Sequence, residues 1–200
     1  MPMYKKLLER PLFYNAWSAI HFIPRLNAIQ EVIKEQTLPS VLDLGCGTGL
    51  LKKHFPACNY TGIDTNLNYI NYARQKLRGQ FILGSILELE RIGLRDQFDF
   101  IILNGVLHHL ENGNAVRLIS SLNRYLKAQG KIIVIDHFFG GELNPINNLL
   151  LKWDRGCFSR TEDEYRSLFR QFSTLLYSVF DITAGPFVLW KQVRFVLTCC

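Results

Sequence analysis

The sequence predicts a single α/β domain with a largely parallel sheet. The first reason is that short apolar segments typical of buried strands alternate with segments of helical periodicity. The second is that the first strand runs directly into a glycine-rich loop and a short helix. The third is that the next strand ends in an acid, Asp64. A chain of 200 residues suffices for one domain with a substantial core.

The glycine-rich segment, Val-Leu-Asp-Leu-Gly-Cys-Gly-Thr-Gly at residues 41–49, is the most informative stretch. Glycines at 45, 47 and 49 let a ligand approach the backbone, and the following helix N-terminus favours an anion or carboxylate. A dinucleotide fingerprint has the spacing Gly-x-Gly-x-x-Gly, and here Leu50 occupies the place of the third glycine. The spacing therefore disfavours a dinucleotide.

The same segment resembles motif I of the class I S-adenosylmethionine-dependent methyltransferases, in which Asp-x-Gly-x-Gly-x-Gly follows the first strand. The resemblance implies S-adenosylmethionine as cofactor and S-adenosylhomocysteine as product. It also implies a doubly wound, Rossmann-like sheet of seven strands in the order 3-2-1-4-5-7-6, with strand 7 antiparallel. The cofactor-binding residues that it implies in this loop are Asp43, Gly45, Cys46, Gly47 and Gly49.

Asp64 ends the second predicted strand, residues 59–64. It follows the glycine loop at about the interval at which nucleotide-binding folds place an acid on ribose hydroxyls. A carboxylate can accept hydrogen bonds from both hydroxyls, and the resemblance puts Thr65 near the adenine. The alternative for Asp64 is to cap the helix predicted over 66–78, a role that Thr65 or Asn66 could also fill.

Ser85 follows the third predicted strand, residues 81–83. Many relatives carry an acid here that bonds the adenine amino group, and the serine supplies a hydroxyl without the charge. Ile86 would then offer an apolar edge to the ring. Alternatively, Ser85 caps a helical turn over residues 86–91.

Residues 98–110 resemble the fourth strand and following loop of small-molecule methyltransferases. By that resemblance Asn104 and Gly105 lie beside the methionine end of the cofactor. The segment lacks the Asn/Asp-Pro-Pro-Tyr/Phe and Pro-Cys motifs of enzymes that methylate nucleic-acid bases. His108 and His109 both suggest a general base, since imidazole titrates near neutral pH. His109 is the candidate catalytic residue, or else a structural or cofactor-shell residue.

Asp136 and His137 follow the fifth predicted strand, residues 132–135. Ligands of open α/β sheets bind outside the carboxyl ends of the strands, which places this pair to meet an acceptor. A histidine near an acid suits deprotonation of a hydroxyl or amine. Both residues are therefore candidate catalytic groups, and the alternative is an ordinary polar pair between strand and loop.

The resemblance divides the domain, residues 1–200, into four parts. These are an N-terminal helical cap (1–38), a cofactor-binding core (39–139), an acceptor-side insertion (140–172) and a C-terminal hairpin (173–200). Within the cap, Pro24 is expected to start a new helix. Candidate lid residues of the cap are Tyr4 and Tyr14, and candidate acceptor contacts of the insertion are Trp153, Arg155 and Phe158.

Composition and charge restrict the kinds of partner that the protein is expected to bind. The net charge of +6 comes from scattered residues rather than a basic stripe with aromatics, so no nucleic acid is expected. Five cysteines lack metal-ligand spacing, which predicts free thiols, no metal and a cytoplasmic protein. No apolar run could span a bilayer and no signal peptide is apparent. Contact with a membrane stays open, and the oligomeric state is unknown.

The predicted function is methyl transfer from S-adenosylmethionine to the oxygen or nitrogen of a small or medium-sized acceptor. Orientation of the acceptor can supply about 7–11 kcal/mol of barrier lowering, so a base is needed only for a protonated acceptor. The alternatives are a membrane-associated lipid or quinone methyltransferase, a non-catalytic S-adenosylmethionine-binding protein and a nucleotide-binding oxidoreductase.

Overall fold

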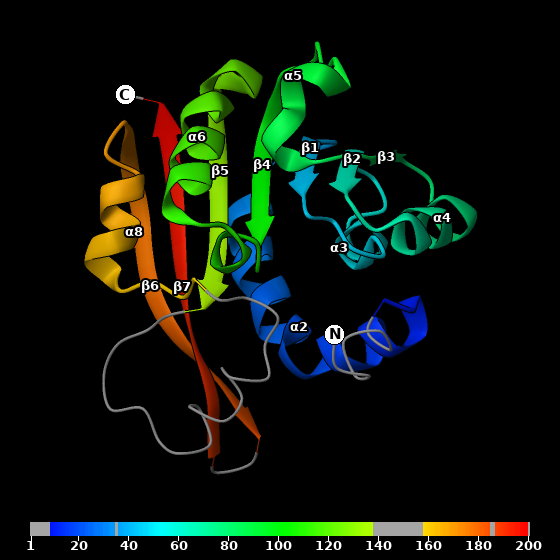
Figure 1. Cartoon of the computed structure of the whole chain (residues 1–200), viewed down its shortest axis with the longest axis horizontal. Coiled ribbons are helices and arrows are strands. Elements are labelled where there is room, and N and C mark those ends of the chain that lie inside the picture. The colour runs from blue at the N-terminus through cyan, green and yellow to red at the C-terminus, as the bar shows by residue number, and fades with distance from the viewer. Residues whose placement is uncertain (1–8, 35, 138–157, 185–186, 200) are drawn as a thin grey trace.

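The computed structural model describes residues 9–34, 36–137, 158–184 and 187–199, which form a seven-stranded sheet between helices (Figure 1). The strand order is β3-β2-β1-β4-β5-β7-β6. Strands β1 to β5 pair in parallel, and β7 runs antiparallel to both β5 and β6, which confirms the predicted topology. The bounds are β1 Ser40–Leu44, β2 Asn59–Asp64, β3 Gln80–Leu83, β4 Phe98–Asn104, β5 Leu126–His137, β6 Phe172–Ala184 and β7 Phe187–Cys199.

Helices cover both faces of the sheet. Alternate residues of β1 belong to different clusters of buried side chains: Leu42 and Leu44 face one, and Val41 faces the other. Helices α6 and α8 contribute to the first cluster, and helices α2, α3 and α4 to the second. The helical segments are α2 Pro11–Ile33, α3 Leu50–His54, α4 Leu67–Lys76, η1 Ile86–Glu88, α5 Leu89–Ile92, η2 Leu107–His109, α6 Asn112–Ser121, η3 Leu122–Tyr125 and α8 Glu162–Leu168.

Helix α2 is continuous, so the prediction that Pro24 starts a new helix is wrong. A proline inside a helix removes one backbone hydrogen bond and costs about 3 kcal/mol. Beyond Pro24, however, Leu26, Ile29 and Ile33 are buried against the sheet. Each such side chain stabilises by about 1.5–3 kcal/mol, so their burial outweighs the cost of the proline.

Residues 161–164 read Thr-Glu-Asp-Glu, the pattern of a capping box, and helix α8 begins there. Thr161 Oγ1 accepts a hydrogen bond from Glu164 N, and the Glu164 carboxylate accepts one from Thr161 N. Three candidate residues of the cap and the insertion, Tyr4, Trp153 and Arg155, lie outside the described residues. Within the described ranges, no helix is both long and apolar enough to cross a membrane.

The β6–β7 hairpin extends past the rest of the sheet (Figure 1). Strand β5 pairs with β7 only from Gln192 to Leu197, whereas β6 pairs with β7 from Phe187 to Cys199. The part of β7 before Gln192 therefore belongs to a two-stranded ribbon beyond the carboxyl end of β5.

Candidate active site

Two adjoining cavities lie where the parallel strands end. The larger has a volume of about 450 Å³ and extends over the ends of β2 and β3. The smaller has a volume of about 110 Å³ and lies against α2, β5 and β7. Both cavities are lined by Tyr14, Gly45, Asn104, Gly105 and His109. A single elongated site is thus formed at the carboxyl edge of the sheet, as expected for an open α/β fold.

The glycine loop between β1 and α3 leaves no room for side chains. Gly45, Gly47 and Gly49 all have positive φ, at 79°, 56° and 77°. A Cβ on Gly45 would lie 2.7 Å from the Val106 side chain, and one on Gly47 would lie 2.9 Å from the Tyr14 hydroxyl. The loop therefore keeps its backbone open to a ligand only with glycine at these positions.

Cys46 lies in the same loop and lines the smaller cavity. Its thiol is buried and donates to Gly47 O at 3.7 Å. Burial and the neighbouring carboxylates Asp43 and Asp64 raise the pKa of this thiol well above its usual value. Cys46 is therefore a neutral packing residue and not a thiolate nucleophile.

Asp64 ties the glycine loop to the end of β2. Its Oδ2 accepts from Gly47 N at 2.9 Å and its Oδ1 accepts from Asn66 N at 2.8 Å. The cap of α4 is Asn66, whose side chain accepts from the backbone of Asn68 and Tyr69. Of the two roles that the sequence allowed, capping thus falls to Asn66. Asp64 lines the larger cavity beside Thr65.

Ser85 and Ile86 line the opposite wall of the larger cavity. Ser85 Oγ also accepts from Leu87 N at 3.2 Å and caps the turn η1. The capping role is therefore observed, and it leaves the hydroxyl proton available to a ligand.

Tyr14 reaches over the glycine loop from α2. Its ring lies 4.6 Å from the ring of Tyr69 on α4, between centroids. Because Tyr14 lines both cavities and contacts the position of Gly47, α2 forms part of the wall of each.

Asn104 ends β4 at the junction of the two cavities. Its Oδ1 is buried and accepts no hydrogen bond from the residues that the structure describes. A buried amide oxygen without a partner costs about 1–3 kcal/mol, so a ligand that donates a hydrogen bond would be stabilised here. Gly105 follows with φ of 70°, and a Cβ there would lie 2.7 Å from an Arg25 guanidinium nitrogen.

Asp136 is fully buried, which corrects the prediction that it meets an acceptor. Its Oδ1 bonds the His108 Nδ1 and accepts from His137 N at 2.7 Å, and its Oδ2 accepts from His108 N at 3.1 Å. Burial alone would raise the pKa of Asp136, but the His108 ring and these N–H donors hold it well below its usual range. Asp136 thus positions two histidines.

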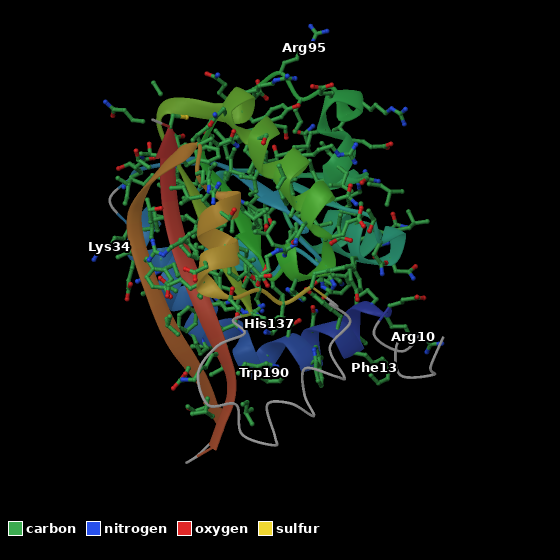
Figure 2. The ribbon with its side chains drawn as sticks, turned by 60° about the vertical axis from the view of Figure 1, so that its left-hand side comes forward. Arg10, Phe13, Lys34, Arg95, His137 and Trp190 are labelled. Atoms are coloured by element: carbon green, nitrogen blue, oxygen red, sulfur yellow. The ribbon has the colours of Figure 1, made fainter. Side chains whose placement is uncertain are left out.

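His137 lines the smaller cavity. Its ring lies near that of Trp190 of β7, with 6.4 Å between centroids (Figure 2). The sequence paired His137 with an acid, but its ring Nδ1 lies 2.9 Å from Gln192 Nε2. Gln192 Oε1 in turn accepts from Arg25 Nε at 3.1 Å. The neighbouring ring is that of His108, with 4.4 Å between centroids.

His109 is exposed, and its ring contacts that of His108 in a tilted arrangement, with centroids 4.0 Å apart. Phe158 lines neither cavity within the described structure, although its backbone N–H donates to His108 O. His108 also lines the smaller cavity, as do residues that the sequence analysis did not assign to the site: Trp17, Ser18, Phe22, Arg25, Leu51 and Trp190.

Asp43 lies within β1 and lines the smaller cavity, with 3% of its surface exposed. Tyr60 Oη donates to its Oδ2 at 2.5 Å. Burial raises the pKa of Asp43 to about 7, although the Tyr60 hydrogen bond partly opposes the shift. The folded state therefore binds this proton more tightly than the unfolded state does.

This difference predicts that Asp43 makes stability fall as the pH rises from about 4 to about 7. Asp43→Asn removes the titrating group, so its stability relative to the native chain should increase by up to about 4 kcal/mol over that range. Urea denaturation at pH 4.5 and pH 8 measures the change. Asp99→Asn is the matched control, for which the change in relative stability should have the opposite sign. Burial raises the pKa of Asp99, but its interactions with Lys127 and Ser40 outweigh this effect and lower the pKa overall. A relative stability that is independent of pH would contradict the assignment.

Comparisons with known proteins agree with this architecture. A family model described as a methyltransferase domain matches residues 41–130. An uncharacterized methyltransferase of Alkaliphilus oremlandii is 23% identical over 178 residues, 88% of this chain and 81% of that protein. The malonyl-[acyl-carrier protein] O-methyltransferase of Bacillus cereus is 29% identical over 58% of this chain, which spans only 44% of that protein's length.

Two solved structures share the fold. A Pyrococcus horikoshii protein superposes with a TM-score of 0.69 at 17% identity, and all of both chains is covered. The magnesium protoporphyrin IX methyltransferase of Synechocystis, solved with bound S-adenosylhomocysteine, gives 0.68 at 16% identity over 96% of each chain. The methyltransferase-domain match, the methyltransferase relatives and the shared fold support a class I S-adenosylmethionine-dependent methyltransferase.

Proposed function

We propose that the chain transfers a methyl group from S-adenosylmethionine to the oxygen or nitrogen of a small or medium-sized acceptor. The observation that carries the proposal is the pair of cavities that share Asn104 and Gly105. The larger cavity suits a nucleoside, and the smaller cavity suits the reacting ends of cofactor and acceptor.

The residues of the larger cavity fit an adenosyl group. The Asp64 carboxylate lines it and would accept from the ribose hydroxyls. Thr65, Ser85 and Ile86 would surround the adenine. The fit is supported by complementary chemistry, because hydroxyl donors would meet a carboxylate and an apolar ring would meet Ile86.

The residues between the cavities fit the methionine part. The buried Asn104 Oδ1 would accept from its ammonium group, and Gly105 leaves the backbone open beside it. The glycine loop would lie against the rest of the amino-acid part. Its proposed contacts are Asp43, Gly45, Cys46, Gly47 and Gly49, and Tyr14 would cover them.

When bound, the cofactor supplies a methyl group made electrophilic by its sulfonium. The chain then has to hold the acceptor in line with that methyl group and exclude water, which can lower the barrier by about 7–11 kcal/mol. Trp17 and Trp190, whose rings lie 6.2 Å apart between centroids, flank the smaller cavity and would bound the acceptor. We assign the N-terminal cap and the acceptor-side insertion to this side of the site, since α2 walls both cavities.

Calorimetry with S-adenosylhomocysteine, together with a screen of phenols, alcohols, amines and carboxylic acids for S-adenosylhomocysteine release, tests the proposal. We expect one molecule bound per chain and turnover of at least one acceptor class. Asp181→Asn, which removes an exposed partner of Lys191, is the control and should change neither result. Binding of a nicotinamide dinucleotide in place of S-adenosylhomocysteine would favour an oxidoreductase. Binding without turnover of any acceptor would favour a non-catalytic protein.

A further inference from the structure

The smaller cavity contains two buried histidine rings, His108 and His137, which contact each other edge to face. Each ring uses Nδ1 for a hydrogen bond with a buried neighbour. In a neutral imidazole one nitrogen donates and the other accepts. The chemistry of each neighbour therefore decides where each ring carries its proton.

For His108 the neighbour is a carboxylate. Asp136 is fully buried and its two oxygens also accept from the backbone N–H groups of His108 and His137. An ionised carboxylate only accepts hydrogen bonds, so His108 Nδ1 donates to it. The lone pair of a neutral His108 is consequently on Nε2.

For His137 the neighbour is an amide whose orientation is fixed by an arginine. The Arg25 guanidinium has donors only, so the atom of Gln192 that faces it must be the oxygen. The Gln192 amide nitrogen then faces His137 and donates to its Nδ1. The proton of a neutral His137 is consequently on Nε2. This argument assigns the amide from its partners and does not depend on distinguishing nitrogen from oxygen.

We propose that His108 is the general base of methyl transfer and that the acceptor is a hydroxyl compound, with Asp136 and Gln192 as the positioning residues that set opposite tautomers in the two rings. The inference rests on the proposed function. It assigns the role of base to His108, whose ring contacts those of His109 and His137, instead of to either of those two residues. His137 instead presents a hydrogen-bond donor, suited to an acceptor oxygen.

The proton and electron balance is simple. His108 Nε2 takes the proton of the acceptor hydroxyl as the oxygen pair forms the new bond to the methyl carbon. The pair of the broken carbon–sulfur bond stays on sulfur and cancels its positive charge. His108 later returns its proton to solvent, and no other reactant is required.

The charged groups around the two rings favour this division. Asp136 accepts from His108 Nδ1, so His108 can keep this hydrogen bond after Nε2 has taken the proton of the acceptor. Arg25 orients Gln192, whose amide donates to His137 Nδ1 and leaves no acceptor there for a further proton. Other titratable groups lie nearby. Asp43 on β1 lines the same cavity, and the His109 ring on η2 contacts that of His108. Arg160, before α8, donates to Leu107 O, and the Tyr165 hydroxyl on α8 donates to His137 O.

Long-range proton–nitrogen NMR correlation of the ¹⁵N-labelled chain reads the tautomers directly. We expect His108 in the Nδ1–H form and His137 in the Nε2–H form near neutral pH. Gln192→Leu should remove the preference at His137 and leave His108 unchanged. Gln97→Leu, directly before β4 and at the end of the sheet away from the cavity, should change neither ring. The native spectrum decides the tautomers by itself, so the test survives a variant that fails to fold.

Turnover on a hydroxyl acceptor completes the test. His108→Gln should lower kcat about 100-fold or more and abolish the acidic limb of the pH profile, with S-adenosylhomocysteine affinity kept. His137→Gln should retain that limb. An Nε2–H tautomer at His108, an Nδ1–H tautomer at His137, a doubly protonated His108 at the pH optimum or an unchanged profile in His108→Gln would overturn the inference. Loss of S-adenosylhomocysteine binding in the native chain would instead overturn the proposed function.

Discussion

Asp64→Ala is expected to weaken S-adenosylhomocysteine binding about 100-fold, with the fold retained. The variant would lose charge-assisted hydrogen bonds to two ribose hydroxyls, worth about 1.5–3 kcal/mol each. It would also release Gly47 N, which the Asp64 carboxylate now accepts from at 2.9 Å. A loss of about 3 kcal/mol corresponds to about 100-fold in the dissociation constant. Isothermal calorimetry measures it, and circular dichroism checks the fold.

Asp64→Asn separates the two contributions. An asparagine keeps an oxygen that can accept from Gly47 N but loses the negative charge. Its affinity should therefore lie between those of the native chain and Asp64→Ala. If Asp64→Ala binds S-adenosylhomocysteine as tightly as the native chain does, Asp64 does not hold the ribose.

Asp136→Ala is expected to lower the free energy of unfolding by about 3–5 kcal/mol, because each buried N–H donor left without its acceptor costs about 1–3 kcal/mol. The carboxylate of Asp136 is the acceptor for three N–H groups of His108 and His137. Its removal leaves these donors buried without an acceptor. Urea denaturation at pH 7.5 measures the loss.

The pH dependence of this loss has a definite sign. Because the folded state lowers the pKa of Asp136, its stabilisation is present above the unfolded value of about 3.9 and is lost as the pH falls further. The deficit of Asp136→Ala should therefore persist from pH 7.5 to pH 5. Asp181→Ala, in an exposed pair with Lys191, should cost less than about 1 kcal/mol. Equal costs for the two variants would contradict the buried pair.

Most of the fold could be predicted because each strand is recognisable from the residues of its own segment. Each strand before the C-terminal hairpin is an apolar segment bounded by turn residues, and the resemblance supplied the strand order. The exception is α2, where a local rule about Pro24 was outweighed by burial against the sheet. The burial of α2 depends on sheet residues far away along the chain, so the local sequence around Pro24 does not indicate it.

Within the site, residues of contiguous motifs could be predicted from the sequence, whereas residues that meet only in the folded chain could not. Gly45, Gly47 and Asp64 belong to contiguous motifs, and all three line or order the larger cavity. Arg25 and Gln192, by contrast, are 167 positions apart and meet only through the fold. The sequence also could not tell which of the adjacent His108 and His109 faces inward, because the turn η2 that orients them has no periodic pattern of its own.

The β6–β7 hairpin extends past the sheet, so the two sides of the proposed site are supported by different numbers of neighbouring strands. The adenosyl side is built on β1, β2 and β4, where a change in one strand disturbs two neighbours. Trp190 belongs to the part of β7 that pairs with β6 and not with β5, and in the proposed site it bounds the acceptor. On that proposal, substitutions in the β6–β7 ribbon would change the acceptor that fits, while the strands beneath the methyl donor would stay the same.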